Sequence, residues 1–101
     1  MSEAVNHPQH YQKEGRKECI KEMEEQFGKY YTEIFALLSA YKYIYRAGEK
    51  EGNSWHQDIE KAKWYIQYAE DLRVNMDYGF ERACVKQLTK DVKEELANVE
   101  S

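Results

Sequence analysis

Apolar residues recur at helical spacing along most of this 101-residue chain, and no segment shows the strict alternation of a half-buried strand. A short amphipathic helix is expected from about Arg16 to Phe27, because Gly28 then supplies a stop signal. Its apolar positions are Cys19, Ile20, Met23 and Phe27.

Two longer helices are expected to follow. Thr32 can cap the first of them, the central core helix, which is expected to run to Ala47. The second is expected over about 55–76, and it begins with the capping-box pattern Ser54-x-x-Gln57. The predicted inward residues are Ile34, Leu37, Leu38, Tyr41, Ile44 and Tyr45 in the central helix, and Ile59, Ala62, Tyr65, Ile66, Ala69 and Leu72 in the next one.

A break at 75–79 precedes a fourth predicted helix, from Phe80 to about Asn98. Its apolar seam is narrow, which suits helix pairing within the chain or between subunits. The seam consists of Val85, Leu88, Val92, Leu96 and Val99. The fold class is therefore all-α: a small bundle of three core helices and a C-terminal helix, preceded by an extended arm. We expect the arm over residues 1–15, the helical core domain over 16–76 and the C-terminal helix, a candidate oligomerisation element, over 77–101.

The composition narrows the class of protein. The formal net charge is −4 at pH 7, so a broad nucleic-acid surface is not expected. Nine tyrosines outnumber the two tryptophans and three phenylalanines, and tyrosine suits half-buried surfaces such as subunit interfaces. The two cysteines form no C-x-x-C pattern, and no apolar run fits a signal peptide or a membrane span. We therefore expect a cytoplasmic homo-oligomer with free thiols and no membrane partner.

The segment KYIYRAGEKEGN, residues 42–53, ends the central helix and continues as a charged loop. Lys42 and Arg46 are four residues apart and share a helical face, and Gly48 can end the helix in a left-handed conformation. Asp58 falls on the apolar face of the next helix, where an unpaired charge is costly. Lys42 or Arg46 is its expected structural partner.

A phosphate clamp is the second interpretation of the same cations. Arginine offers a two-pronged donor to phosphate and lysine a point charge. The clamp would consist of Lys42, Arg46, Lys50 and Lys61, and the helix that begins near Ser54 would add backbone amides. From the residues alone, both interpretations stay open.

The segment NHPQHY contains the only proline of the chain. It is expected to form a rigid arm that lays His7, His10 and Tyr11 across the edge of the pocket, although a merely packed arm fits equally well. One loose His-x-x-His does not provide the closed set of four ligands of a structural zinc site. No metal site is therefore expected.

Trp64 projects away from the apolar stripe of its predicted helix, toward the side of Tyr68. Exposed tryptophan and tyrosine are typical of binding surfaces. We expect these two residues to lie at an oligomer interface.

Four motifs occur in one order along the chain: NHPQHY, Glu18-Cys19-Ile20, KYIYRAGEKEGN and Asp58-x-x-Lys61-Ala62-x-Trp64-Tyr65. Over roughly residues 5 to 72 they resemble a small bacteriophage family often labelled SaV-like, whose members are mostly of unknown function. One relative in that family is known as a kinase of deoxynucleoside monophosphates, and others are known as phage factors that trigger a host abortive-infection system. The resemblance implies a phage origin and offers a kinase activity.

Familiar nucleotide-enzyme signatures do not fit the chain. GEKEGN lies between two predicted helices and lacks the Lys-Ser/Thr pair of a P-loop, so kinase activity would be unconventional. Glu22 and Glu25 have the E-x-x-E spacing of all-α nucleotide pyrophosphohydrolases, but no E-x-x-D follows on the third helix.

We therefore expect a phage nucleotide-binding protein, acting as a deoxynucleoside monophosphate kinase by phosphoryl transfer from a nucleoside triphosphate. The alternative is a non-catalytic protein that sequesters a host nucleotide signal or contacts a host defence protein. The sequence requires no cofactor beyond the nucleotide, and a need for Mg²⁺ stays open. The expected ligand-binding residues are His7, His10, Tyr11, Lys42, Arg46, Lys50, Asn53 and Lys61.

Overall fold

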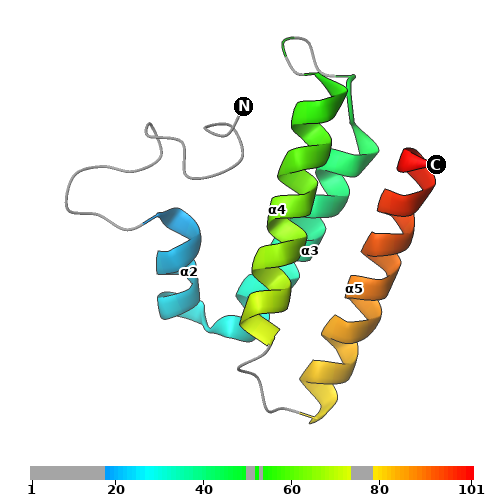
Figure 1. Cartoon of the computed structure of the whole chain (residues 1–101). Coiled ribbons are helices and arrows are strands. Elements are labelled where there is room, and N and C mark those ends of the chain that lie inside the picture. Colours follow the sequence, from blue (N-terminus) through cyan, green and yellow to red (C-terminus); the bar gives the residue numbers. More distant parts are fainter. Residues whose placement is uncertain (1–17, 50–51, 53, 74–78) are drawn as a thin grey trace.

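The computed structural model describes residues 18–49, 52, 54–73 and 79–101, and all regular structure within these ranges is helical. The expected all-α fold is thereby confirmed (Figure 1). The predicted arm and both predicted domain boundaries lie outside the described residues. In chain order the helices are α2 (Cys19–Phe27), α3 (Lys29–Tyr45), α4 (Trp55–Arg73) and α5 (Gly79–Glu100).

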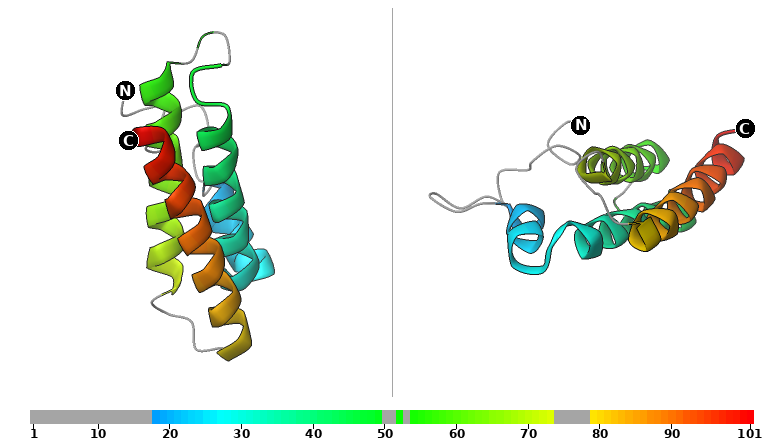
Figure 2. Two further views of the ribbon diagram at one scale, coloured as in Figure 1. Left: turned by 90° about the vertical axis from the view of Figure 1, so that its right-hand side faces the viewer. Right: turned by 90° about the horizontal axis from the view of Figure 1, so that it is seen from below.

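Helix α3 occupies the centre of the molecule and contacts each of the other three helices. Helix α4 returns antiparallel to α3, and α5 packs along another side of α3 while touching α4 far less (Figures 1 and 2). The result is thin, with Cα extents of 40 × 39 × 16 Å. None of the described helices combines the length and apolar content needed to cross a membrane.

Small residues bring α3 and α4 close together. Ala36 and Ala40 on α3, and Ala62 and Ala69 on α4, are all completely buried. Because helix spacing depends on the side chains at the contact, alanines here permit a close approach of the two backbones. The larger buried members of the same cluster are Ile20, Leu37, Ile44, Ile66 and Val92.

The beginning of α3 differs from the prediction. The helix already starts at Lys29, after Gly28 with φ +96°, so the predicted cap at Thr32 is wrong. The Thr32 hydroxyl instead donates a hydrogen bond back to the Gly28 carbonyl oxygen over 2.8 Å. This internal bond allows a buried threonine to lie in the first turn of a helix.

The predicted inward stripe of α3 is only half correct. Leu37 and Ile44 are buried, but Leu38, Tyr41 and Tyr45 are exposed. The helix is apolar on nearly all sides, so periodicity could not show which side α4 and α5 would cover. The face that they cover consists of Thr32, Glu33, Ala36, Leu37, Ala40 and Ile44.

The other helices follow their patterns more closely. Residues Ser54 and Gln57 form the expected capping box: the Gln57 amide donates to Ser54 Oγ (3.0 Å), and the Ser54 amide donates to Gln57 Oε1 (3.3 Å). The predicted inward residues of α4 are buried except Tyr65, which is half-buried. In α5, Val85 and Val92 are buried, so most of its seam is used within the chain.

Helix α2 buries less than its pattern predicted. Only Ile20 is fully covered, whereas Cys19 and Phe27 are exposed. A helix of nine residues that lies against α3 with one narrow face covers few side chains. Cys19 is thus a surface thiol, contrary to its expected place on the apolar face.

Close packing between α3 and α4 predicts that Ala62→Leu destabilises the protein. Added methylene groups in a tightly packed core typically cost about 1–3 kcal/mol. Urea denaturation should therefore give a lower midpoint for Ala62→Leu than for the wild type. The matched control, Ala83→Leu at an exposed position of α5, should leave the midpoint nearly unchanged; equal effects of the two substitutions would contradict the close packing.

Candidate functional site

The turn after α3 is held by a carboxylate from α4. Gly48 adopts φ +78°, the left-handed conformation expected for it, and its amide donates to Asp58 Oδ2 over 3.0 Å. Asp58 is completely buried in the first turn of α4. An ideal Cβ on Gly48 would lie 3.3 Å from the Trp55 Cβ, so both the backbone and the space favour glycine here.

Three cations surround the ring of Tyr43. The Lys42 Nζ and the Arg46 Cζ each lie 4.8 Å from the ring centroid, and the Lys61 Nζ lies 5.3 Å from it. Tyr43 in turn stacks on Tyr65 of α4, with centroids 5.9 Å apart and an angle of 12° between the planes. We call these cations and the Tyr43 ring the Tyr43 cation cluster. Three of the predicted phosphate-clamp residues therefore lie together, at the end of the α3–α4 pair.

The cations of this cluster have no carboxylate partner among the described residues. The described partner of Asp58 is the Gly48 amide, in place of the expected Lys42 or Arg46. Two buried polar atoms nearby have no hydrogen-bond partner in the described part of the chain: the donor Arg46 Nε and the acceptor Asp58 Oδ1. Such atoms in a folded protein call for a bound water, ion or ligand.

Five predicted ligand residues lie outside the described residues, so the structure does not place them relative to this cluster. They are His7, His10, Tyr11, Lys50 and Asn53. Within the described ranges, no three His, Cys, Asp or Glu side chains gather closely enough to hold a metal ion.

Trp64 and Tyr68, the predicted interface residues, are half-buried, and Tyr68 contacts α2 within the same chain. The Tyr68 hydroxyl donates to Glu24 Oε1 over 3.2 Å, and the Lys21 Nζ lies 5.2 Å from the Tyr68 ring centroid. Burial, followed by the negative charge of Glu24, raises the pKa of Tyr68. The hydroxyl therefore stays protonated at neutral pH and can keep donating to Glu24.

These residues line an open groove of about 430 Å³ between α2 and α4. Its charged lining side chains have both signs, and one of its two aromatic residues, Tyr68, is engaged in holding α2. The groove therefore carries less electrostatic preference for an anion than the Tyr43 cation cluster does.

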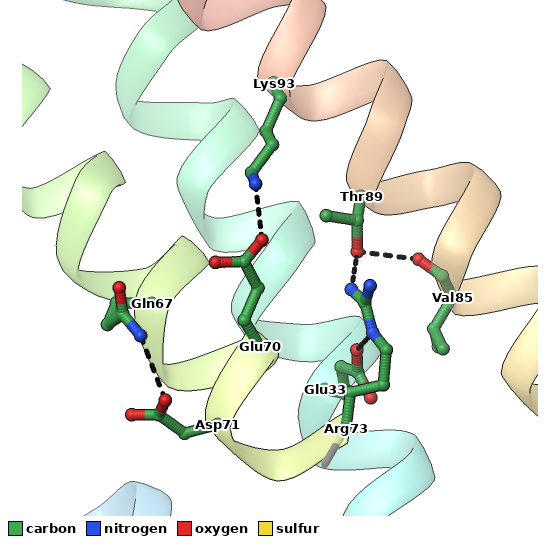
Figure 3. A network of polar contacts seen from close by, with 8 residues as sticks. All are labelled: Glu33, Gln67, Glu70, Asp71, Arg73, Val85, Thr89 and Lys93. Carbon is green, nitrogen blue, oxygen red and sulfur yellow. Dashed lines mark hydrogen bonds and ion pairs between the residues drawn. The ribbon is translucent and has the colours of Figure 1, made fainter.

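A second polar cluster, which the sequence analysis missed, joins α3, α4 and α5 (Figure 3). The Arg73 Nε donates to Glu33 Oε2 over 2.9 Å, and the Arg73 Nη2 donates to Thr89 Oγ1. Thr89 donates in turn to the Val85 carbonyl oxygen over 2.7 Å. Beside it, Lys93 pairs with Glu70. We call the contacts among Glu33, Arg73 and Thr89 the Glu33–Arg73–Thr89 network.

Glu33 is completely buried, and its negative charge is compensated by the ion pair with Arg73. Burial raises the pKa of Glu33 above its ordinary value of 4.5, Arg73 opposes this shift by hydrogen bonding and charge, and Glu70 adds to it. The burial of Glu33 could have been inferred from the sequence. Glu33 lies four positions before Leu37, so the two residues share one face of the helix, and Leu37 is predicted to point inward.

The two clusters differ in how far their charges are satisfied. In the Glu33–Arg73–Thr89 network the Arg73 guanidinium has a carboxylate and a hydroxyl partner, which is typical of a structural contact, although the buried Glu33 Oε1 has no hydrogen-bond partner among the described residues. In the Tyr43 cation cluster the positive charges meet only an aromatic ring among the described side chains. The Tyr43 cation cluster is therefore the better candidate for binding an anion.

The raised pKa of Glu33 predicts a specific pH dependence. A carboxyl group whose pKa is higher in the folded state binds more protons there, so its contribution to the free energy of unfolding grows as the pH falls through the folded pKa toward 4.5. Glu33→Gln lacks this titration. The difference in unfolding free energy, wild type minus variant, should therefore increase between neutral pH and pH 4.5 when measured by denaturant titration. A difference that decreases over this range would show that Arg73, and not burial, dominates.

Comparison with known proteins places the chain in a family without giving it an activity. Neither a curated protein nor a solved structure matches the chain. The sequence profile of DUF3310, described as proteins of unknown function, matches residues 5–67. This segment contains α2, α3, most of α4 and the whole Tyr43 cation cluster, but ends before Arg73 and α5. The chain therefore belongs to the DUF3310 family.

Proposed function

We propose that this chain binds the phosphate groups of a nucleotide at the Tyr43 cation cluster. The observation that carries the proposal is the convergence of Lys42, Arg46 and Lys61 on one ring without a carboxylate partner among the described residues. Three neighbouring cations that do not neutralise one another repel, and a phosphate would relieve that repulsion.

The donors suit a phosphate group. Arg46 provides a planar, permanently charged guanidinium with several donors, and its buried Nε has no partner among the described residues. Lys42 and Lys61 add point charges from α3 and α4 respectively. Helix α4 begins at Trp55, and the partial positive charge of a helix start also favours an anion.

The enzymatic form of this function is phosphoryl transfer from a nucleoside triphosphate to a deoxynucleoside monophosphate. Phosphoryl transfer depends mainly on positioning the reactants and stabilising negative charge, which cations can do without a P-loop. The resemblance to a family with a kinase member supports this form, in which Arg46, Lys42 and Lys61 would stabilise the charge on the transferred group.

The alternative is a non-catalytic protein that sequesters a host nucleotide signal or contacts a host defence protein. One observation favours it: Asp58, the buried carboxylate in the first turn of α4, already accepts the Gly48 amide and supports the turn. A base that activates an attacking hydroxyl would need to lie within hydrogen-bond reach of the substrate.

Native mass spectrometry distinguishes these forms in one experiment. The purified protein is measured alone and after incubation with ATP, Mg²⁺ and each deoxynucleoside monophosphate. Appearance of a deoxynucleoside diphosphate supports the kinase, and a retained, unchanged nucleotide supports sequestration. A protein that binds none of these nucleotides would contradict the proposed function and leave contact with a defence protein.

Arg46→Ala should weaken nucleotide binding by about ten- to a hundredfold, since hydrogen bonds to charged groups contribute about 1.5–3 kcal/mol. The protein should remain folded, because Arg46 forms no ion pair among the described residues. Isothermal titration calorimetry measures the affinity, and circular dichroism checks the helix content.

Lys90→Ala, at an exposed position of α5, is the matched control that removes one positive charge elsewhere. It should leave the affinity within about twofold of the wild-type value, as expected for a distant surface charge screened by salt. Equal losses in both variants would mean that net charge, and not the Tyr43 cation cluster, governs binding. Unfolding of Arg46→Ala would instead indicate a structural role for this arginine.

A further inference from the structure

Helix α3 is apolar on the face that the rest of the chain leaves uncovered. Its charged residues are only Lys29, Glu33 and Lys42. A helix that is apolar all round is normally buried in a protein core or in a membrane. The described helix α3 does not have the length and apolar content needed to cross a membrane. Yet Tyr31 is 65% exposed, Leu38 53% and Tyr45 73%. Something outside the described contacts is therefore expected to cover this face.

The exposed residues, together with the half-buried Ile34, follow a heptad pattern. Tyr31, Ile34, Leu38, Tyr41 and Tyr45 are separated by alternating steps of three and four residues, which places them in one narrow line. This line, the α3 seam, runs about 21 Å along the helix at 1.5 Å per residue. Tyr41 and Tyr45 stack on one another at its C-terminal end, with centroids 6.2 Å apart. Such a seam is typical of one helix that pairs with another.

The apolar area of the α3 seam, with the neighbouring Phe35, fits a dimer of standard size. From the exposed fractions, and about 150–250 Å² for each aromatic side chain, roughly 500 Å² of apolar surface is accessible. A standard interface buries about 800 Å² on each partner, and about 65% of a homodimer interface is apolar. The available area therefore equals the apolar share that one subunit would contribute.

We infer that the α3 seam is the subunit interface of a homodimer and that a second copy of α3 covers it. A heptad seam needs a partner with a matching line of knobs and holes. The seam of α5, the other narrow seam described, is already used within the chain because Val85 and Val92 are buried. A second α3 seam therefore supplies the complementary surface. The inferred interface therefore lies on α3, and not at Trp64 and Tyr68 of α4.

A two-fold symmetric pairing assigns a special place to Leu38. It is the midpoint of the α3 seam, seven residues from both Tyr31 and Tyr45. In a pairing that aligns the two seams fully, Leu38 of each subunit faces Leu38 of the other, whether the helices run parallel or antiparallel. Leu38 is thus the most sensitive position of the interface.

The test is the mass of the full chain in solution, measured by sedimentation equilibrium over a range of concentrations. The wild type should have twice the chain mass of 12.1 kDa. Leu38→Glu places a charge at the centre of the interface on both subunits, and should raise the dimer dissociation constant at least about thirtyfold. Val99→Glu changes another exposed apolar residue, on α5, and should leave the dimer intact.

A cysteine cross-link tests the position of Leu38 without disturbing the charge. In a protein with Cys19→Ser and Cys84→Ser, Leu38→Cys should form a disulfide-linked dimer on mild oxidation, and Val99→Cys should not. A monomeric wild type would overturn the inference, as would a Leu38→Glu variant that dimerises normally. A monomer destabilised by Leu38→Glu would show that a segment of the same chain covers the seam, which also overturns it. None of these results depends on nucleotide binding.

Discussion

The ion pair between Glu33 and Arg73 is the contact on which the arrangement of the helices depends. Helices α4 and α5 touch one another little, so the Arg73 guanidinium, which bonds Glu33 of α3 and Thr89 of α5, links all three. Removing one partner of a buried ion pair typically costs about 3–5 kcal/mol, because the other charge is left uncompensated. This network, together with the buried Val85 and Val92, therefore holds α5 on α3, while the buried alanines permit the close approach of α4.

At the other end of the α3–α4 pair, the two helices are joined by a hydrogen bond and an aromatic stack, without an ion pair among the described residues. Asp58 accepts the Gly48 amide and so fixes the turn, and Tyr43 stacks on Tyr65 across the two helices. Because Asp58 bonds the turn amide and not a cation, Lys42, Arg46 and Lys61 are left around the Tyr43 ring without a carboxylate partner among the described residues. The same fold thus has one end whose charges are paired and one end suited to binding a phosphate.

The sequence predicts the features of the fold that depend on a few neighbouring residues. The capping box at Ser54, the left-handed Gly48 and the inward place of Asp58 each depend on a few neighbouring residues, and all three are present. The sides of α3 could not be predicted in the same way, since a helix apolar all round gives periodicity no polar face to detect. Glu33 was missed because its partner Arg73 lies forty residues away on another helix. All eight candidate ligand residues stay predictions as ligands, and five of them lie outside the described part of the chain.

The most direct test of phosphate binding at the Tyr43 cation cluster is a nuclear magnetic resonance titration of the ¹⁵N-labelled protein with a deoxynucleoside monophosphate. The account predicts saturable shifts of the Arg46 Nε–H and Gly48 amide signals, while the amides around Lys86, Lys90 and Lys93 on α5 stay unchanged. Shifts confined to α5, or no saturable shift at Arg46, would contradict the account.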